Sequence, residues 1–369
     1  MISCRIPVLA FVAYSGTGKT SLLRRLIPRL RAAGLRLGAV KHAHHGFDID
    51  LPGKDSYELR QAGAEQVLVA SASRWAWMRE QPEARGDPPL QELLHRLQPE
   101  ALDLVLVEGF KHESLPKIEL HRPSTGQPPL FPGDPEIIAV ASDGPLSPTP
   151  NIAQLDLNDP EAITAFVLAW HQGVVKATAE EGSRALRREL VRHYRWLRRY
   201  GCNDSHSGNA SVRDGDRFWV TPTGCCADTL QPEQIIPCPL QGPCPAGASL
   251  DAPLHQRVYQ LNPRASAVLH SHGPHSVALT LNGRDFLPAD FEGQLYFPRV
   301  PVIDIPYQDY VREAPEQVAE ALGSWRLVIV RGHGVYAAGE NLNLAYKWTC
   351  SLELSAKTAF IARLAGTLA

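Results

Sequence analysis

Short apolar runs alternate with segments of helical periodicity through the first half of the chain. The runs are predicted to be strands and cover residues 8–13, 38–40, 66–70, 102–107 and 137–140. This alternation favours an α/β fold with a mostly parallel sheet flanked by helices. Two stretches rich in proline and glycine, 80–90 and 122–135, are predicted to be exposed loops.

Helical periodicity over residues 160–170 closes this half, and the periodicity then fades. We therefore interpret residues 1–172 as one domain, 173–184 as a linker and 185–369 as a second domain. A chain of 369 residues agrees with two domains at the usual size of about 100–200 residues each.

The second domain is predicted to begin with an amphipathic helix. Its apolar stripe recurs at helical spacing and consists of Leu186, Leu190, Tyr194 and Leu197. The arginines of the same segment lie mostly off this stripe, and we interpret them as a solvated helix face. Short strands and helices follow, and a last long helix is predicted over 341–364.

Composition narrows the class of protein. Hydrophobic residues make up 44% and charged residues 21% of the chain, which excludes a disordered or fibrous protein. A formal charge of −2 provides no general attraction for nucleic acid or an anionic membrane, and we expect neither as a partner. No apolar run is long enough to span a bilayer. The seven cysteines include no C-x2-C pair, so we expect reduced thiols and a cytoplasmic protein.

A glycine-rich motif follows the first predicted strand and precedes an amphipathic helix. Backbone N–H groups of such a turn and the helix N-terminus bind phosphate oxygens. The motif is AYSGTGKT, and the predicted nucleotide-binding residues are Gly16, Thr17, Gly18, Lys19, Thr20 and Ser21. Lys19 would reach the outer phosphates and the Thr20 hydroxyl would bind Mg²⁺. Ala13 stands in place of the usual first glycine, which requires an ordinary backbone conformation there.

A magnesium–triphosphate site usually takes a second acidic group from a neighbouring strand. The run LDLVLVEGF begins at Leu102, with Asp103 at its start and Glu108 at its end. Ligands of open parallel sheets collect at the carboxyl ends of the strands, so Glu108 is the preferred Mg²⁺ ligand. No N-K-x-D segment is present, and these residues alone do not choose the nucleotide base.

Three strings in this half resemble the MobB family of molybdopterin-guanine dinucleotide biosynthesis adapter proteins. They are VAYSGTGKTSLL, VKHAHHGFDIDLPGKDSYELRQAGAEQVLVAS and DLVLVEGFKHESLPKIELHR. The resemblance covers most of residues 5–170, with Lys19, Thr20 and Glu108 at matching positions. It implies GTP binding, weak GTP hydrolysis, dimers, and the molybdenum cofactor guanylyltransferase and molybdoenzymes as partners. The polar string KHAHHGFDIDLPGKDS, which begins at Lys41, holds three histidines and three acids that could bind a metal, but a polar loop facing the nucleotide is the preferred interpretation.

Three histidines in the second half have the spacing of metal ligands. His270 and His272 lie two apart at the end of an apolar run, so both imidazoles leave the same face of a strand. His333 ends another apolar run, between two glycines. Three imidazoles with an open fourth position are typical of a catalytic zinc site. By spacing alone, a hydrogen-bonded polar pair and an unrelated turn residue are an equally open interpretation. His275 is expected in the first turn of the next helix.

The segments SGNASVR, VTPTG and ASLDAPLHQRVY, followed by HSH and RGHG, resemble the class II aldolase and adducin family over roughly residues 185–366. The resemblance implies an α/β/α domain that uses Zn²⁺ to polarise the oxygens of a sugar phosphate. By the family pattern, the substrate phosphate would be held by Gly208, Asn209, Thr223, Gly224 and Ser249.

The chain departs from this family's pattern at the residues that move protons. Asp251 is the predicted catalytic residue: it stands where aldolases carry a glutamate base, whereas an epimerase branch uses aspartate there as a metal ligand. A metal-bound carboxylate is a poor base, so Asp251 cannot fill both roles at once. Leu250 replaces a phosphate-binding serine, and Gln294 falls near the acid of the epimerases. The tail lacks the tyrosine that both branches use as proton donor.

Together these patterns predict a fusion of a GTP-binding adapter with a zinc-dependent aldehyde-lyase-type domain, in a homo-oligomer. Two alternatives remain for the second domain: an adducin-like interaction module without catalysis, or an epimerase or dehydratase of the same family. For the first domain the alternative is a small-molecule kinase, which would need a substrate-binding lid that no segment supplies.

Overall fold

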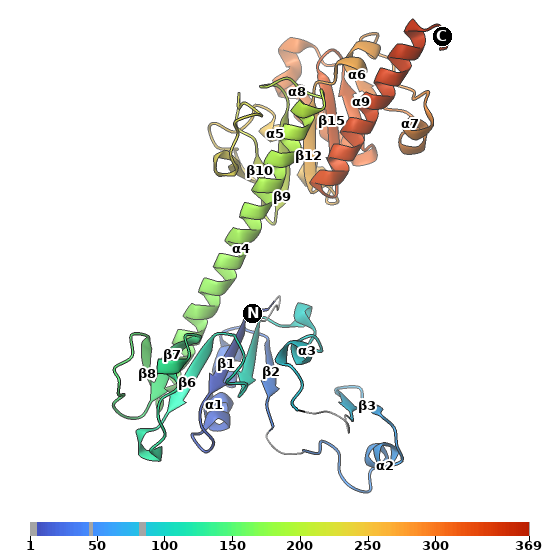
Figure 1. Ribbon diagram of the computed structural model, residues 1–369. Helices are drawn as coiled ribbons and strands as arrows, with labels where there is room; N and C mark the ends of the chain where they lie inside the picture. The colour runs from blue at the N-terminus through green and yellow to red at the C-terminus, as the bar shows by residue number, and fades with distance from the viewer. Residues whose placement is uncertain (1–5, 44–46, 81–85, 369) are drawn as a thin grey trace. The chain divides into compact units, whose positions relative to one another are not determined.

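The computed structural model describes residues 6–43, 47–80 and 86–368. The chain divides into two compact units, Met1–Ala177 and Thr178–Ala369, each with its own sheet (Figure 1). Among the described residues no helix combines the length and apolarity that crossing a bilayer requires. The six cysteines within these ranges are free thiols.

The first unit is built on a six-stranded sheet whose strands are all parallel, as predicted, in the order β2-β5-β1-β6-β7-β8. The strands are β1 (Val8–Val12), β2 (Leu37–Lys41), β5 (Leu104–Glu108), β6 (Lys117–His121), β7 (Ile137–Ser142) and β8 (Ala153–Asp156). Strands β6 and β8 were not predicted. In β6 the polar residues Lys117, Glu119 and His121 interrupt the hydrophobic run, yet all three are buried.

Helices cover both faces of this sheet. On one face, α1 (Lys19–Ala32) buries Leu22, Leu26 and Leu30, and the start of α4 (Pro160–Arg199) packs in the same cluster. On the other face, the short α3 (Leu90–Leu94) packs against β1 and β5. The predicted loop over 122–135 contains two 3-10 turns, Pro123–Thr125 and Phe131–Gly133. In the predicted loop over 80–90, residues 81–85 lie outside the described ranges.

The predicted strand over residues 66–70 forms, but not in the main sheet. β3 (Gln66–Ala70) pairs antiparallel with β4 (Trp75–Arg79) in a separate hairpin, and α2 (Asp55–Gln61) precedes it. A tight turn explains why β3 pairs with β4 instead of joining the main sheet. The Ser71 hydroxyl donates to the Arg74 carbonyl at 3.0 Å, and the chain reverses direction directly after β3. A parallel neighbour would need a crossover of about a dozen residues.

The segment 173–184, predicted to be a linker, is helical instead. Helix α4 runs without interruption from Pro160 to Arg199, and the division between the units falls inside this segment, after Ala177. The segment contains no proline, and its alanine, glutamate, lysine and arginine residues favour helix. Its two glycines, Gly173 and Gly182, each cost only about 1 kcal/mol relative to alanine. Fading amphipathicity therefore marked the unit boundary rather than the end of the helix.

The second unit has a seven-stranded sheet in the order β11-β10-β9-β12-β15-β14-β13, antiparallel except for the pair β13–β14. The strands are β9 (Asn209–Asp214), β10 (Arg217–Val220), β11 (Ile236–Pro239), β12 (Ala267–Ser271), β13 (Val302–Ile303), β14 (Leu327–Val330) and β15 (Gly334–Gly339).

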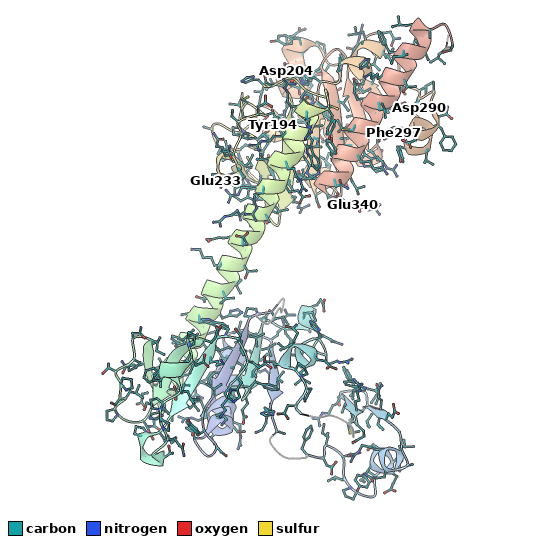
Figure 2. The ribbon with its side chains drawn as sticks, viewed as in Figure 1. Tyr194, Asp204, Glu233, Asp290, Phe297 and Glu340 are labelled. Atoms are coloured by element: carbon teal, nitrogen blue, oxygen red, sulfur yellow. The ribbon has the colours of Figure 1, made fainter. Side chains whose placement is uncertain are left out.

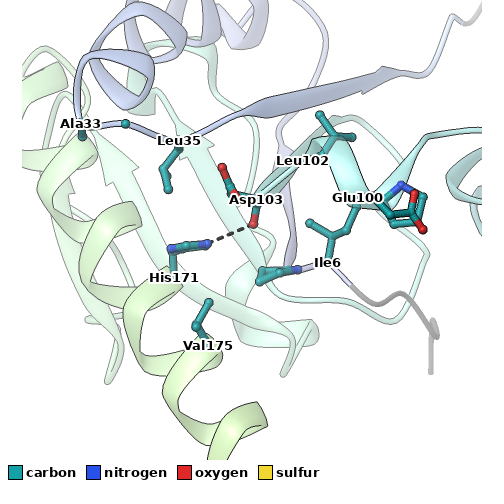
Figure 3. A pocket seen from close by; sticks show the side chains of 11 residues that line it. Ile6, Ala33, Leu35, Glu100, Leu102, Asp103, His171 and Val175 are labelled. Atoms are coloured by element: carbon teal, nitrogen blue, oxygen red, sulfur yellow. Dashed lines mark hydrogen bonds between the residues drawn. The ribbon is translucent and has the colours of Figure 1, made fainter. Parts of the chain in front are cut away.

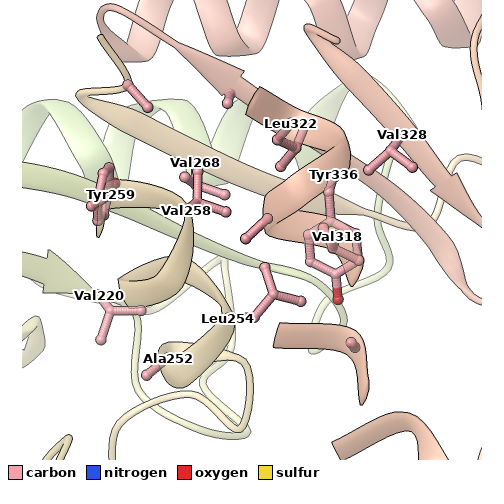
Figure 4. Close-up of a cluster of buried hydrophobic side chains, with 14 of the residues drawn as sticks. Val220, Ala252, Leu254, Val258, Tyr259, Val268, Val318, Leu322, Val328 and Tyr336 are labelled. Atoms are coloured by element: carbon pink, nitrogen blue, oxygen red, sulfur yellow. The ribbon is translucent and has the colours of Figure 1, made fainter. Parts of the chain in front are cut away.

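Helices on both faces of this sheet give the predicted α/β/α arrangement. One face packs on α5 (Ala252–Leu261) and α8 (Tyr310–Ser324); Figure 4 shows this core, which includes Tyr336. The other face packs on the end of α4 and on α9 (Leu342–Leu364), which confirms the predicted last helix. The predicted stripe is buried at Leu190, Tyr194 and Leu197. Two short helices, α6 (Pro274–Leu279) and α7 (Phe291–Tyr296), complete the unit.

Candidate functional sites

The glycine-rich turn has the backbone conformation that its sequence predicts. Gly16 and Gly18 adopt φ values of 80° and 103°, in the left-handed region that favours glycine, and Gly18 leads directly into α1. Among the described residues Phe110 is the single non-glycine residue with positive φ, so Ala13 has an ordinary backbone conformation. The turn therefore tolerates alanine in place of the first glycine.

Lys19 is folded back onto this turn. Its Nζ donates to the carbonyls of Ala13 at 3.1 Å and Tyr14 at 3.2 Å. Burial lowers the pKa of Lys19; Glu108 opposes this shift, and the nearby ammonium groups of Lys41 and Lys111 add to it. Three cationic side chains thus act on one small region, which favours an anion.

The two predicted Mg²⁺ ligands meet although they are far apart in the sequence. The Thr20 hydroxyl donates to both carboxylate oxygens of Glu108, at 2.8 and 3.0 Å. Asp103, the rejected candidate, lies at the opposite end of β5 and pairs with Arg36 at 2.8 Å. The acid chosen for its position at the carboxyl end of a strand is therefore the one beside the turn.

A cavity of about 1120 Å³ lies at this edge of the sheet. Its lining includes the turn, Lys41 and His42 after β2, and residues 108–113 after β5. Arg122, just after β6, donates from Nε to the Thr17 carbonyl at 3.0 Å and pairs with Asp143. Lys41 belongs to the polar string that was expected to face the nucleotide, and it lines the cavity. Lys111 and Arg122 were missed; each follows a strand at this edge, and that position is the signal that could have found them.

The polar string after β2 is only partly described. His44 and His45 lie outside the described residues. Asp48 and Asp50 pair with Arg60 at 2.7 and 2.9 Å. These two acids therefore brace their own segment.

A second hollow, of about 620 Å³, lies at the opposite edge of the same sheet (Figure 3). It is lined by residues that precede β1 and β5, and His171 on α4 bonds the Asp103 carbonyl at 3.0 Å there. The amino ends of parallel strands are not where open α/β sheets bind ligands. This hollow also lacks the glycine-rich turn, so the larger cavity is the candidate nucleotide site.

In the second unit, neighbouring strands place three polar side chains in one row. His270 on β12 is directly opposite Asn209 on β9 and Tyr336 on β15. Residues opposite one another in a sheet point to the same face, and the His270 and Tyr336 rings stack with centroids 4.0 Å apart. This row forms the floor of the candidate metal site.

The three predicted zinc ligands converge above this floor. His270 Nε2 lies 2.8 Å from His272 Nε2 and 3.0 Å from His333 Nε2. Among the described residues, this is the group of His, Cys, Asp or Glu side chains close enough to hold a metal ion. His275 lies in the first turn of α6, as predicted, and its Nδ1 bonds Glu353 at 2.7 Å.

The environment keeps these imidazoles neutral. Burial lowers the pKa of His270 well below its usual value, and burial also lowers the pKa of His272 and His333. The Nδ1 of His270 is 3.1 Å from the Val335 carbonyl and donates to it, so the lone pair of this neutral ring lies on Nε2 and faces the other two histidines. Neutral imidazoles with free Nε2 lone pairs are metal ligands.

Asp251 caps this site at the start of α5. Its Oδ2 accepts from Asn209 Nδ2 and Tyr336 Oη, and its Oδ1 accepts from Tyr310 Oη, each at 2.8 Å. Burial raises the pKa of Asp251, but the influence of His270 and the hydrogen bonds from Asn209 and Tyr336 outweigh it and lower the pKa to about 2. Its nearest approach to an imidazole is 3.9 Å, to His270 Nε2. Asp251 is thus an ionised carboxylate beside the three histidines.

The predicted phosphate-binding residues lie on three segments, which the structure joins in part. The Thr223 amide donates to Gly247 at 3.0 Å, and the Ser249 amide to Thr221 at 3.1 Å, so these two segments run side by side. Asn209 is buried and turns its amide nitrogen to Asp251. Thr223 and Gly224 are exposed to solvent.

Comparisons with known proteins assign each unit. The family model described as molybdopterin guanine dinucleotide synthesis protein B matches residues 8–143. The Class II Aldolase and Adducin N-terminal domain model matches residues 188–360. The molybdopterin-guanine dinucleotide biosynthesis adapter protein of Escherichia coli is 54% identical over 168 residues, which are 45% of this chain and 94% of that protein.

The Escherichia coli L-fuculose phosphate aldolase is 30% identical over 163 residues, covering 43% of this chain and 75% of the aldolase. The chain belongs to both families. A solved L-fuculose-1-phosphate aldolase from Thermus thermophilus is 35% identical, with a TM-score of 0.46, and the match covers 48% of this chain and 94% of that chain. We call residues Met1–Ala177 the MobB unit and Thr178–Ala369 the aldolase unit.

Two tyrosines of the aldolase unit were missed by sequence reasoning. Tyr310 begins α8 and Tyr336 lies inside β15, and burial and the charge of Asp251 raise the pKa of both phenols. They keep their protons and donate to Asp251, and their hydroxyls also contact each other. No spacing connects them to Asp251, because Asp251, Tyr310 and Tyr336 come from three different elements, the N-terminus of α5, α8 and β15. Gln294, expected near an acid position, instead donates to the carbonyls of Pro288 and Ala289.

At Gly208 of the aldolase unit, a side chain would both strain the backbone and overlap its neighbours. It adopts a φ of 70°, and an added Cβ would overlap Asn203 Nδ2 and lie 2.5 Å from the His270 carbonyl. Its own carbonyl accepts from Tyr194, which is labelled in Figure 2. We expect Gly208→Ala to lower the free energy of unfolding of this unit by about 1–3 kcal/mol, measured by urea denaturation. Gly215→Ala, also at positive φ but with nothing within 4 Å, is the control for backbone strain alone.

Proposed function

We propose that the MobB unit is a GTP-binding adapter in the biosynthesis of molybdopterin guanine dinucleotide. The observation that carries this proposal is the pairing of Thr20 with Glu108 beside the glycine-rich turn, in a cavity with three lysines. The 54% identity to an adapter of this name supports it. Its partner is the guanylyltransferase that completes the cofactor, and molybdoenzymes are further partners.

Calorimetry of the full chain with GTP or ATP, with and without Mg²⁺, tests the first proposal. We expect heat of binding with GTP and Mg²⁺, and a weaker response to ATP. The absence of heat with either nucleotide would remove the adapter role, because the turn would then be a structural feature only. Equal affinity for GTP and ATP would contradict the proposed preference for guanine.

For the aldolase unit we propose a zinc-dependent aldehyde-lyase-type reaction on a sugar phosphate or a related carbonyl compound. The carrying observation is the convergence of three Nε2 atoms on one point, 2.8 and 3.0 Å apart. Ligands of a tetrahedral Zn²⁺ bound at about 2.0 Å would be about 3.3 Å apart, so a small opening of the rings fits the ion. This arrangement supports a metal site, and a retained metal site favours catalysis over an interaction module.

Each residue then has a defined task. His270, His272 and His333 would hold the ion, which polarises a carbonyl or hydroxyl oxygen when bound. Asp251, ionised and hydrogen-bonded, is placed to accept a proton from a substrate carbon or hydroxyl beside the histidines. Gly208, Asn209, Thr223, Gly224 and Ser249 would hold the phosphate with neutral donors, since hydrogen bonds to a charged oxygen are strong.

A panel of phosphorylated ketoses and aldonates, added to the zinc-loaded chain, tests this reaction. Release of an aldehyde product supports a lyase, whereas isomeric products would indicate an epimerase. A chain that holds zinc but turns over nothing in the panel would favour the interaction module. Repeating the assay with GTP present tests whether GTP binding to the MobB unit changes the turnover rate of the aldolase unit.

A homo-oligomer is also part of this proposal. Tyr307 and Phe291 of the aldolase unit are 96% and 84% exposed, and a contact between copies of the chain would cover such aromatic side chains. Light scattering of the purified chain measures the assembly.

A further inference from the structure

Lys41 occupies the place between the two predicted Mg²⁺ ligands. Its Nζ donates to Glu108 Oε1 at 3.0 Å and to the Thr20 hydroxyl oxygen at 3.1 Å. Lys41 is the last residue of β2 and lies directly opposite Glu108 in the parallel register of β2 and β5. Its location is therefore set by the sheet.

In the nucleotide-free chain, the Lys41 ammonium neutralises the charge of the Glu108 carboxylate. The Glu108 side chain is only 12% exposed, whereas the Lys41 side chain is 57% exposed and can leave. A poorly hydrated carboxylate needs a cation beside it, and an ammonium group on a long, flexible stem can supply one or withdraw. A divalent cation bound by Thr20 and Glu108 would compete for the same oxygens, because two cations repel each other at this distance.

We propose that Lys41 is an internal counter-ion for Glu108 that Mg²⁺ displaces when the nucleotide binds. This inference rests on the proposed GTP-binding function and adds a residue to it. Lys41 lines the same cavity as Lys19 and Lys111, so the displaced ammonium stays within reach of a bound phosphate. Lys41 thereby couples metal binding to nucleotide binding. It stabilises the complex with nucleotide in the absence of Mg²⁺, and it competes with Mg²⁺ for Thr20 and Glu108.

The coupling is measured by comparing nucleotide affinity in two conditions. The probe is mant-GTP, and its dissociation constant is determined by fluorescence anisotropy in excess EDTA and in saturating Mg²⁺. The ratio of the two constants reports how far Mg²⁺ strengthens binding. A general loss of positive charge from the cavity raises both dissociation constants by a similar factor, so it leaves their ratio unchanged.

We expect Lys41→Met to raise this ratio about tenfold, because the metal-free complex loses the counter-ion of Glu108 while the metal-bound complex keeps one. Lys41→Arg, which retains the charge, should give a ratio near that of the unchanged chain. Lys111→Met is the matched control: it lines the same cavity, and its Nζ lies over the Tyr14 ring, 5.6 Å from the centroid. Its ratio should not change.

Two results would overturn the inference. The first is an unchanged ratio in Lys41→Met, and the second is an equal rise in Lys111→Met, which would show that the effect does not come from the contacts of Lys41 with Thr20 and Glu108. In both cases the unchanged chain still binds mant-GTP, so the proposed function survives. If the unchanged chain binds no mant-GTP in either condition, the proposed function fails and the role of Lys41 fails with it.

Discussion

A His270→Ala/His272→Ala double variant should lose its zinc. The unchanged chain is expected to carry about one Zn²⁺ per chain after dialysis, as measured by inductively coupled plasma mass spectrometry. The variant removes two of three converging imidazoles, and His333 alone cannot hold the ion against a chelating buffer. His270 is buried and stacked on Tyr336, so circular dichroism must show that the variant still folds.

His275→Ala is the control for this result. His275 lies three residues beyond His272, in the first turn of α6, but it bonds Glu353 and is not one of the three converging imidazoles. We expect it to retain zinc. A double variant with full zinc content would place the metal elsewhere and contradict the site. An unchanged chain that takes up no zinc would favour the interaction module over the lyase.

Local sequence patterns predicted the parts of both sites that lie on one segment. The glycine-rich turn between a strand and a helix predicted Lys19 and Thr20, and alternation along β12 placed His270 and His272 together. In each case a short segment contains both the residues and the geometry that positions them. Predictions of this kind need only the period of a strand or the start of a helix.

Contacts between distant segments were predictable only where topology constrained them. Glu108 was found because parallel strands end at a shared edge. Tyr310 and Tyr336 were not found, because their approach to Asp251 depends on the register of β12 with β15 and on the position of α8. The hydrophobic periodicity of a single segment does not predict how that segment aligns with a neighbouring strand or helix.

The errors in secondary structure have a related cause. Strand β6 reads as polar, yet the Lys117 ammonium pairs with Asp134 at 2.7 Å and Glu119 accepts from the amides of Leu130 and Phe131. Those partners come from the following loop, so the buried charges are satisfied by residues that a strand pattern does not include. Conversely, α4 crosses the unit boundary because nothing in residues 173–184 stops a helix.

Lys19→Ala should weaken the binding of GTP with Mg²⁺ by roughly 10- to 100-fold. The Lys19 ammonium donates to two backbone carbonyls, and among the described residues it forms no salt bridge that its removal would break. In the complex the lost ammonium would have made charge-assisted hydrogen bonds to phosphate, worth about 1.5–3 kcal/mol. Isothermal titration calorimetry of the full chain measures the change.

Lys54→Ala is the matched control, because Lys54 is exposed at the start of α2 and does not line the nucleotide cavity. It should bind GTP as the unchanged chain does. Zinc content should be the same in both variants, since the three histidines lie in the other unit. Loss of zinc together with GTP binding in Lys19→Ala would contradict two independently folded sites. Unaltered GTP affinity would mean that the ammonium of Lys19 stays on the carbonyls of Ala13 and Tyr14 and never reaches the nucleotide.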